Sequence, residues 1–197
     1  PDAAGRLRET RRVFLNWAPL ALRRDDPAVA WARLERVREL DAATPPPLWY
    51  FAAVLALAMQ EQLEPALALA REAVGAHPAH PVLRNNLAVL LEATGDVAAA
   101  EALLRETATD DPALPQLHKN LGDLLYRSGR YDEATQHYDR AAALAPSLGD
   151  DLFFKLGNLA FRRRATVQAR EYWAQAVRLN PGHQLARANL ELLPVSG

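Results

Sequence analysis

Residues 115–148 read PQLHKNLGDLLYRSGRYDEATQHYDRAAALAPSL, with apolar side chains recurring every three or four residues on both sides of Ser128-Gly129-Arg130. This spacing places the apolar residues on one face of a helix, so the segment predicts two helices joined by a short turn. Pro146 cannot donate the next helical hydrogen bond, and it should therefore end the second helix. The segment predicts a helical hairpin closed by a proline.

The same arrangement recurs along the chain. Prolines that follow helical stretches are spaced 34, 34 and 35 residues apart, at Pro78, Pro112, Pro146 and Pro181. An alanine stands 12 residues before each of these prolines, at Ala66, Ala100, Ala134 and Ala169. One hairpin cannot bury both of its apolar faces, so successive hairpins must stack on one another.

Small and large residues alternate at fixed places in the repeat. A small or modest residue stands 24 residues before each closing proline, at Val54, Ala88, Gly122 and Gly157. A bulky residue stands eight before it in three of the four repeats, at Leu104, Tyr138 and Trp173, while Ala70 departs from the pattern. We expect the small residues to let the two helices approach closely and the large ones to fill the space beside the contact.

Residues 115–149 resemble the tetratricopeptide repeat (TPR) family, whose 34-residue unit is a helix-turn-helix hairpin. The resemblance is carried there by Leu121, Gly122, Ala134, Tyr138, Ala141 and Pro146. Residues 150–183 repeat it with Phe153, Leu156, Gly157, Ala169, Trp173, Ala176 and Pro181. The resemblance implies an all-α fold, a right-handed α-solenoid of TPR hairpins with about five repeats and a C-terminal capping helix.

The repeat divides nearly the whole chain. We expect an N-terminal extension at 1–10, a degenerate first repeat at 11–46, repeats at 47–80, 81–114, 115–149 and 150–183, a capping helix at 184–193 and a tail at 194–197. Pro19 would lie inside the first helix of the degenerate repeat and should kink or end it. Arg187 and Glu191 predict a polar face on the capping helix. The chain begins without methionine, so we expect it to be a piece of a longer protein.

In TPR proteins the first helix of each repeat lines the concave groove, so the resemblance implies a peptide-binding groove of polar and aromatic side chains. Its predicted residues are Asn85, Asn86, Lys119, Asn120, Tyr126, Arg127, Phe154, Lys155, Asn158, Phe161, Arg162 and Asn189. Four of them, the ladder residues, occupy equivalent places: Asn86, Asn120, Lys155 and Asn189. An asparagine amide can pair with the main chain of an extended peptide. The alternative is that these amides only solvate a helix surface.

Positive side chains in the later repeats favour an acidic partner. Lys119, Arg127, Lys155 and Arg162 would form a cationic groove suited to an acidic segment or a free carboxyl terminus, unless they are simply a solvated face. Some TPR proteins hold a terminal carboxylate with a set of lysine, asparagine and arginine residues. That set is incomplete here, because Asp123 and Lys155 stand where asparagines are expected.

The second repeat predicts an apolar groove instead, formed by Leu48, Phe51, Leu55 and Met59. It could accept an amphipathic helix of a partner, or mediate self-association. The interpretation we favour is coverage by the chain's own first helix, around Val13, Phe14 and Trp17.

Composition narrows the function further. The chain has 23 basic and 24 acidic residues, which argues against nucleic acid or membranes as partners; Arg162–Arg164 is the best local case for phosphate. Cysteine is absent, which excludes disulfides and leaves both cytoplasm and periplasm open. Arginine-rich, alanine-rich composition with two lysines favours a bacterial source. The histidines are not spaced for a metal and no phosphate loop occurs, so we expect no cofactor, no metal and no enzymatic activity.

The sequence therefore predicts a protein-protein interaction scaffold that binds a peptide or helical segment of a partner in its concave groove. The alternatives are a self-assembling structural array or an intramolecular adaptor domain of a larger protein, and an adaptor that binds phosphate through Arg162–Arg164.

Overall fold

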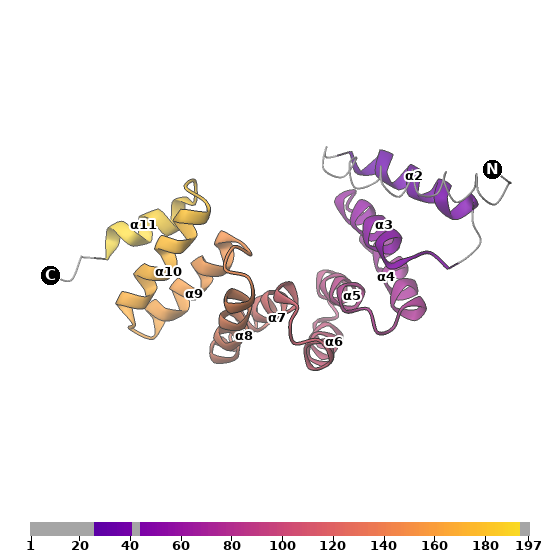
Figure 1. Ribbon diagram of the computed structural model, residues 1–197. Coiled ribbons are helices and arrows are strands. Elements are labelled where there is room, and N and C mark those ends of the chain that lie inside the picture. The colour runs from indigo at the N-terminus through magenta and orange to yellow at the C-terminus, as the bar shows by residue number, and fades with distance from the viewer. Residues whose placement is uncertain (1–25, 41–43, 194–197) are drawn as a thin grey trace. The chain divides into compact units, whose positions relative to one another are not determined.

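The computed structural model describes residues 26–40 and 44–193, which form α-helices joined by short turns and contain no strand (Figure 1). The helices are α2 (Pro27–Leu40), α3 (Pro47–Met59), α4 (Leu63–Ala76), α5 (Pro81–Ala93), α6 (Val97–Asp110), α7 (Pro115–Arg127), α8 (Tyr131–Leu144), α9 (Asp150–Arg162), α10 (Thr166–Leu179) and α11 (Gln184–Leu192). The predicted all-α class is confirmed. Within these ranges, none of the helices has the length and apolar character needed to cross a membrane. The expected extension at 1–10, the kink at Pro19 and the tail at 194–197 lie outside the described residues.

The chain divides into two compact units, Pro1–Leu104 and Arg105–Gly197, with the division inside α6. In unit 1, α3 packs against α2 and α4, and α4 packs against α5. In unit 2, α7 to α11 pack in chain order, each helix against the next. Each unit is therefore built from neighbours in sequence, as expected of a repeat array.

Prolines mark both ends of the hairpins. The first helices α3, α5 and α7 begin with proline, at Pro47, Pro81 and Pro115. Proline suits the first helical position because its missing N–H would have no helical partner there and its φ angle is already helical. The second helices α4, α6, α8 and α10 each end two residues before a proline, at Pro78, Pro112, Pro146 and Pro181. Proline thus both closes one hairpin and opens the next.

The two helices of a hairpin in unit 2 touch where glycine faces an aromatic ring. A Cβ placed on Gly122 would lie 2.6 Å from Cδ1 of Tyr138, and one on Gly157 would overlap the indole of Trp173. Tyr138 and Trp173 are buried. The close approach expected from the small and large residues is present, and only glycine permits it at these two places.

Unit 1 is held together by a different set of aromatic contacts. Trp49 is fully buried, and its Nε1 donates a hydrogen bond to the carbonyl oxygen of Leu34 at 2.8 Å. Tyr50 packs edge-on against it with ring centroids 5.2 Å apart, and its hydroxyl donates to Glu72 at 3.0 Å. Burial and the neighbouring Glu72 carboxylate raise the pKa of Tyr50 to about 12. Because Arg38 of α2 also bonds Glu72, the side chains of Glu72 and Trp49 join α2, α3 and α4.

Each of the four turns that join the hairpin helices between α3 and α10 has one residue in the left-handed backbone conformation. These residues are Glu61 (φ 60°), Gly95 (φ 95°), Gly129 (φ 76°) and Arg164 (φ 63°). After each, an amide bonds back to the carbonyl five residues earlier, for example Arg130 N to Leu125 O at 2.9 Å and Ala165 N to Ala160 O at 3.0 Å. This is the Schellman end of a helix, in which glycine is favoured because a Cβ strains the left-handed conformation. Glu61 and Arg164 are therefore strained.

We expect Glu61→Gly and Arg164→Gly each to stabilise the protein by about 0.5–1 kcal/mol. Glycine relieves the strain of the left-handed conformation, and this gain is larger than the cost of ordering the more flexible glycine on folding. Gly95→Ala and Gly129→Ala, the reverse change at equivalent turns, should destabilise it by a similar amount. Urea unfolding followed by circular dichroism measures both. Destabilisation by Arg164→Gly would mean that the arginine side chain contributes more than its backbone conformation costs.

Candidate functional site

The predicted groove residues lie on the first helices of the hairpins, but in both units. Asn85 and Asn86 lie on α5 in unit 1, and the other predicted groove residues lie on α7, α9 and α11 in unit 2. Asn85 is only 4% exposed, so it presents almost no surface to a ligand. The side chains that the structure brings together are those of unit 2, and they form two groups.

The first group is a closed ring of charges. Lys119 of α7 bonds Asp123 at 2.8 Å and lies 3.3 Å from Asp151. Lys155 of α9 bonds Asp123 at 2.7 Å and Asp151 at 2.8 Å. Two lysines and two aspartates thus neutralise one another, and Asp151 alone of the four is half exposed. Lys119 and Lys155 do not present the uncompensated positive charge expected from the sequence.

Burial and hydrogen bonding oppose each other within this ring. Burial alone would raise the pKa of the Asp123 carboxyl, but hydrogen bonds from Lys119, Lys155 and Tyr138 outweigh it and hold that pKa below its usual value. In the same way, burial alone would lower the pKa of Lys155, but Asp123 and Asp151 raise it. Asp123 and Lys155 therefore both stay charged at neutral pH.

The predicted arginines do not converge on a common point. The Arg162 guanidinium lies 4.2 Å from the ring centroid of Tyr131, a cation-π contact. Arg163 pairs with Asp132 at 2.6 Å, and Arg164 forms the hairpin turn. Arg162 and Arg163 are thus engaged with different partners, and Arg164 is placed by the turn, which does not favour a common phosphate site.

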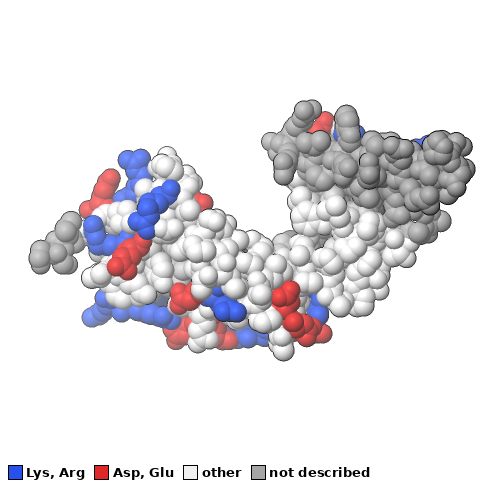
Figure 2. Space-filling model, viewed as in Figure 1, with Lys and Arg blue, Asp and Glu red and all other residues white. Residues whose placement is uncertain are grey.

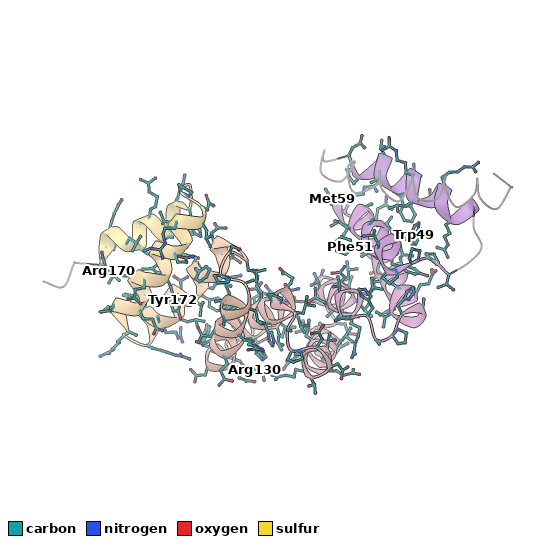
Figure 3. All side chains as sticks on the ribbon, viewed as in Figure 1. Trp49, Phe51, Met59, Arg130, Arg170 and Tyr172 are labelled. Carbon is teal, nitrogen blue, oxygen red and sulfur yellow. The ribbon has the colours of Figure 1, made fainter. Side chains whose placement is uncertain are left out.

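The second group surrounds a pocket of about 250 Å³ between α9, α10 and α11. It is lined by Asn158, Phe161, Trp173, Asn189, Leu192 and Leu193. Trp173 Nε1 donates to Asn158 Oδ1 at 3.1 Å, and Asn189 Nδ2 donates to the same oxygen at 3.4 Å. Arg170 of α10, labelled in Figure 3, donates to the carbonyl oxygens of Leu190 and Leu193 and so ties the end of α11 beside the pocket. Three predicted groove residues, Asn158, Phe161 and Asn189, meet here.

Both groups are oriented from the core in the same way. Tyr138 donates its hydroxyl proton to Asp123 at 2.7 Å, and Trp173 donates its indole proton to Asn158 at 3.1 Å, over a separation of 15 residues in each case. Asp123 and Asn158 each follow the glycine that the aromatic ring touches. From the sequence, the glycine and the aromatic residue predict close packing but not the polar bond, whose only signal is the repeated 15-residue spacing.

Unit 1 offers an apolar surface on α3. Leu48, Phe51, Leu55 and Met59 are 54%, 37%, 38% and 40% exposed. Phe51 and Met59 lie on one side of α3 and the buried Trp49 on the other (Figure 3). The described part of unit 1 is almost without charged side chains on the face seen in Figure 2. Val13, Phe14 and Trp17, which we expected to cover this surface, lie outside the described residues.

Comparison with known proteins agrees with the hairpin geometry. A family model described as tetratricopeptide repeat matches residues 62–115 and 85–149. Among solved structures, Pseudomonas aeruginosa pilF has a TM-score of 0.81 at 17% identity and covers 93% of this chain and 82% of its own. Residues 62–149 thus match the tetratricopeptide repeat family, and the chain has the fold of a tetratricopeptide repeat protein.

Two other solved structures show the same TPR fold. A thermophilic TPR protein from Thermus thermophilus has a TM-score of 0.73 at 17% identity, covering 92% of this chain and 97% of that one. YrrB, described as a TPR protein with an unusual peptide-binding site, has a TM-score of 0.62 at 21% identity, covering 91% of each chain. No curated protein matches the sequence significantly. TPR proteins are in general non-enzymatic scaffolds, so the fold supports a protein-interaction role.

One polar contact of this TPR chain was not expected from the sequence. His118 of α7 donates from Nε2 to the carbonyl oxygen of Pro112 at 3.1 Å, so its Nδ1 must accept the proton of His137 Nδ1 at 3.1 Å. The two rings stack with centroids 5.4 Å apart. The described residues contain no group of three or more histidine, cysteine or acidic side chains placed to hold a metal ion. The contact between the two rings links α7 and α8.

The histidine pair predicts a pH dependence of stability. Burial lowers the pKa of His137 to about 4. The charges of His118 and Arg105 add to this effect, and the Glu133 carboxylate opposes it. In the unfolded chain the histidine pKa is about 6.5, so the unfolded chain takes up the proton before the folded chain does. The contribution of neutral His137 to the free energy of unfolding is therefore complete above about pH 6.5 and is lost as the pH falls toward 4. Solvent screening of the partly exposed ring reduces the effect, so at pH 5 the loss of unfolding free energy should be about 1 kcal/mol.

Urea unfolding at pH 7 and pH 5 tests this, with His137→Asn as the comparison because it keeps a hydrogen-bond donor and does not titrate. The variant should lose less stability than the wild type between the two pH values. An equal loss in both proteins would assign the pH dependence to other groups.

Proposed function

We propose that the chain is a scaffold, without catalytic activity, that binds an extended segment of a partner protein on the face of unit 2 formed by α7, α9 and α11. One observation carries this proposal. Side chains of three successive first helices meet in a single row, since Asp123 of α7 bonds Lys155 of α9 at 2.7 Å and Asn158 of α9 accepts from Asn189 of α11 at 3.4 Å. This row remains accessible to a partner, because Asp151 and Phe161 are each 50% exposed.

The row suits a peptide main chain. An extended segment presents one N–H and one C=O per residue, and the row of amides at Asn120, Asn158 and Asn189 together offers donors and acceptors for them. Such pairing gives affinity that depends little on the partner's sequence. The peptide-binding site named for YrrB, which has the same fold, supports the proposal without identifying the residues here.

The paired charges on this face bear on whether the partner segment must be acidic. The two lysines are already paired with Asp123 and Asp151, so a partner carboxylate could reach them only by displacing the half-exposed Asp151. We therefore propose binding through main-chain hydrogen bonds and apolar contacts, with no requirement for an acidic segment. Affinity should then change little with salt, because few unpaired charges take part.

A random peptide display library, screened against the whole chain, tests the proposal. Selected peptides should bind the double variant Asn120→Ala and Asn189→Ala about tenfold more weakly, the loss expected for one or two hydrogen bonds. Fluorescence anisotropy measures the affinity, and Gln136→Ala, an exposed residue of the second helix α8, is the matched control. Equal affinity for the double variant and the control, or a library without binders, would contradict the proposal.

The apolar surface of α3 supports self-assembly as a second candidate function. Leu48, Phe51, Leu55 and Met59 form an exposed stripe on one helix, and such stripes are common in protein interfaces.

If this surface mediates self-association, the molar mass from light scattering should rise with concentration for the wild type and stay monomeric for Leu55→Glu. Leu63→Glu on α4 is the matched control, because both leucines are 38% exposed. A wild-type protein that stays monomeric at every usable concentration would exclude self-assembly.

A further inference from the structure

The pocket between α9, α10 and α11 is large enough to hold one large side chain. Its volume of about 250 Å³ lies below the roughly 300–1,000 Å³ typical of small-molecule sites. The buried indole of Trp173 forms one wall, with its ring centroid 5.7 Å from that of Phe161. Phe161 is 50% exposed and Leu192 79% exposed, so apolar surface at the pocket is left in water. An apolar side chain placed there would remove this surface from water, which favours binding.

The two asparagines at the pocket have fixed orientations. Indole is a donor only, so the bond from Trp173 requires that Asn158 present Oδ1 toward the ring and Nδ2 away from it. Asn189 in turn presents Nδ2 to Asn158, which leaves Asn189 Oδ1 pointing elsewhere. Within the described residues, neither Asn158 Nδ2 nor Asn189 Oδ1 has a hydrogen-bond partner. One donor and one acceptor thus remain beside an apolar pocket.

This combination is the complement of a peptide residue with a large apolar side chain. Such a residue carries one C=O for Asn158 Nδ2, one N–H for Asn189 Oδ1 and a side chain for the pocket. None of the six lining residues is ionisable, so a charged side chain would lose its hydration without gaining a partner. The chemistry of the site therefore selects an uncharged, apolar residue.

We propose that this pocket is the specificity site of the scaffold, and that it binds a leucine, methionine or phenylalanine side chain of an extended partner segment. The main chain of that residue pairs with Asn158 and Asn189. The proposal rests on the peptide-binding function proposed above and adds to it the residue type that is recognised.

The test uses peptides selected from the display library and the whole chain. The peptides should share one large apolar residue, and its replacement by alanine should weaken binding about 10- to 100-fold, the range expected for burying such a side chain. Leu192→Asp should cause a similar loss. Val167→Asp on α10 is the matched control, since Val167 is 66% exposed and does not line the pocket.

Two further measurements make the assignment specific. The losses from Leu192→Asp and from the alanine peptide should not add when combined, because both remove the same contact. N-methylation of the apolar residue removes the N–H offered to Asn189 and should weaken binding about tenfold. Circular dichroism should show unchanged helix content in both variants, since Leu192 and Val167 are exposed.

The outcomes separate the two proposals. If the Asn120 and Asn189 double variant weakens binding but Leu192→Asp does not, the pocket proposal is overturned and the peptide-binding face stands. If neither variant affects the selected peptides, both proposals are overturned. If deletion of residues 194–197 is needed before any peptide responds to Leu192→Asp, the pocket belongs to the chain's own end, which also overturns the proposal.

Discussion

A single steric constraint underlies each hairpin of unit 2: an aromatic ring of the second helix lies where the Cβ of a first-helix residue would be. The ring of Tyr138 lies against Gly122 and that of Trp173 against Gly157, and both rings are buried. In the α3–α4 hairpin of unit 1 the larger residue is on the first helix instead, since Val54 and Ala70 stand at the equivalent places and both are buried. Ala70, which departs from the repeat pattern, thus stands opposite a larger first-helix residue than glycine, which takes up part of the space that an aromatic ring fills in unit 2.

The aromatic rings connect this packing to the exposed face, because their polar ends reach it. Tyr138 and Trp173 must satisfy an O–H and an N–H within the core, and they do so with Asp123 and Asn158. These acceptors cannot turn freely, so their remaining polar atoms point in set directions. Asp123 offers its carboxylate to Lys119 and Lys155, whereas Asn158 offers an amide N–H beside the pocket. The fold thereby preorganises the groups that we propose bind a partner.

The sequence was sufficient for features that depend on local rules. Helix ends follow from Pro115 and Pro146, and the close helix pair follows from Gly122 and Tyr138, because each depends on backbone chemistry or on residues within one hairpin. The neutralisation of the Lys155 charge could not be predicted, since it depends on the side-chain orientation of Asp123 in the preceding hairpin. The same holds for the pairing of His118 with His137 and for the burial of Asn85. Family positions indicate which face a residue occupies, but not what its side chain already binds.

The ring of charges shows how the chemistry of this face can change without a change of fold. An asparagine in place of Asp123 could still accept the Tyr138 proton, but it would remove one negative charge from a ring in which two lysines and two aspartates balance. The face would become cationic, and acidic segments would then be favoured. Because each of these contacts joins neighbouring hairpins only, the change would leave the Trp173 pocket intact. In a repeat array the residue after the glycine can therefore vary to suit a partner, while the glycine and the ring maintain the hairpin.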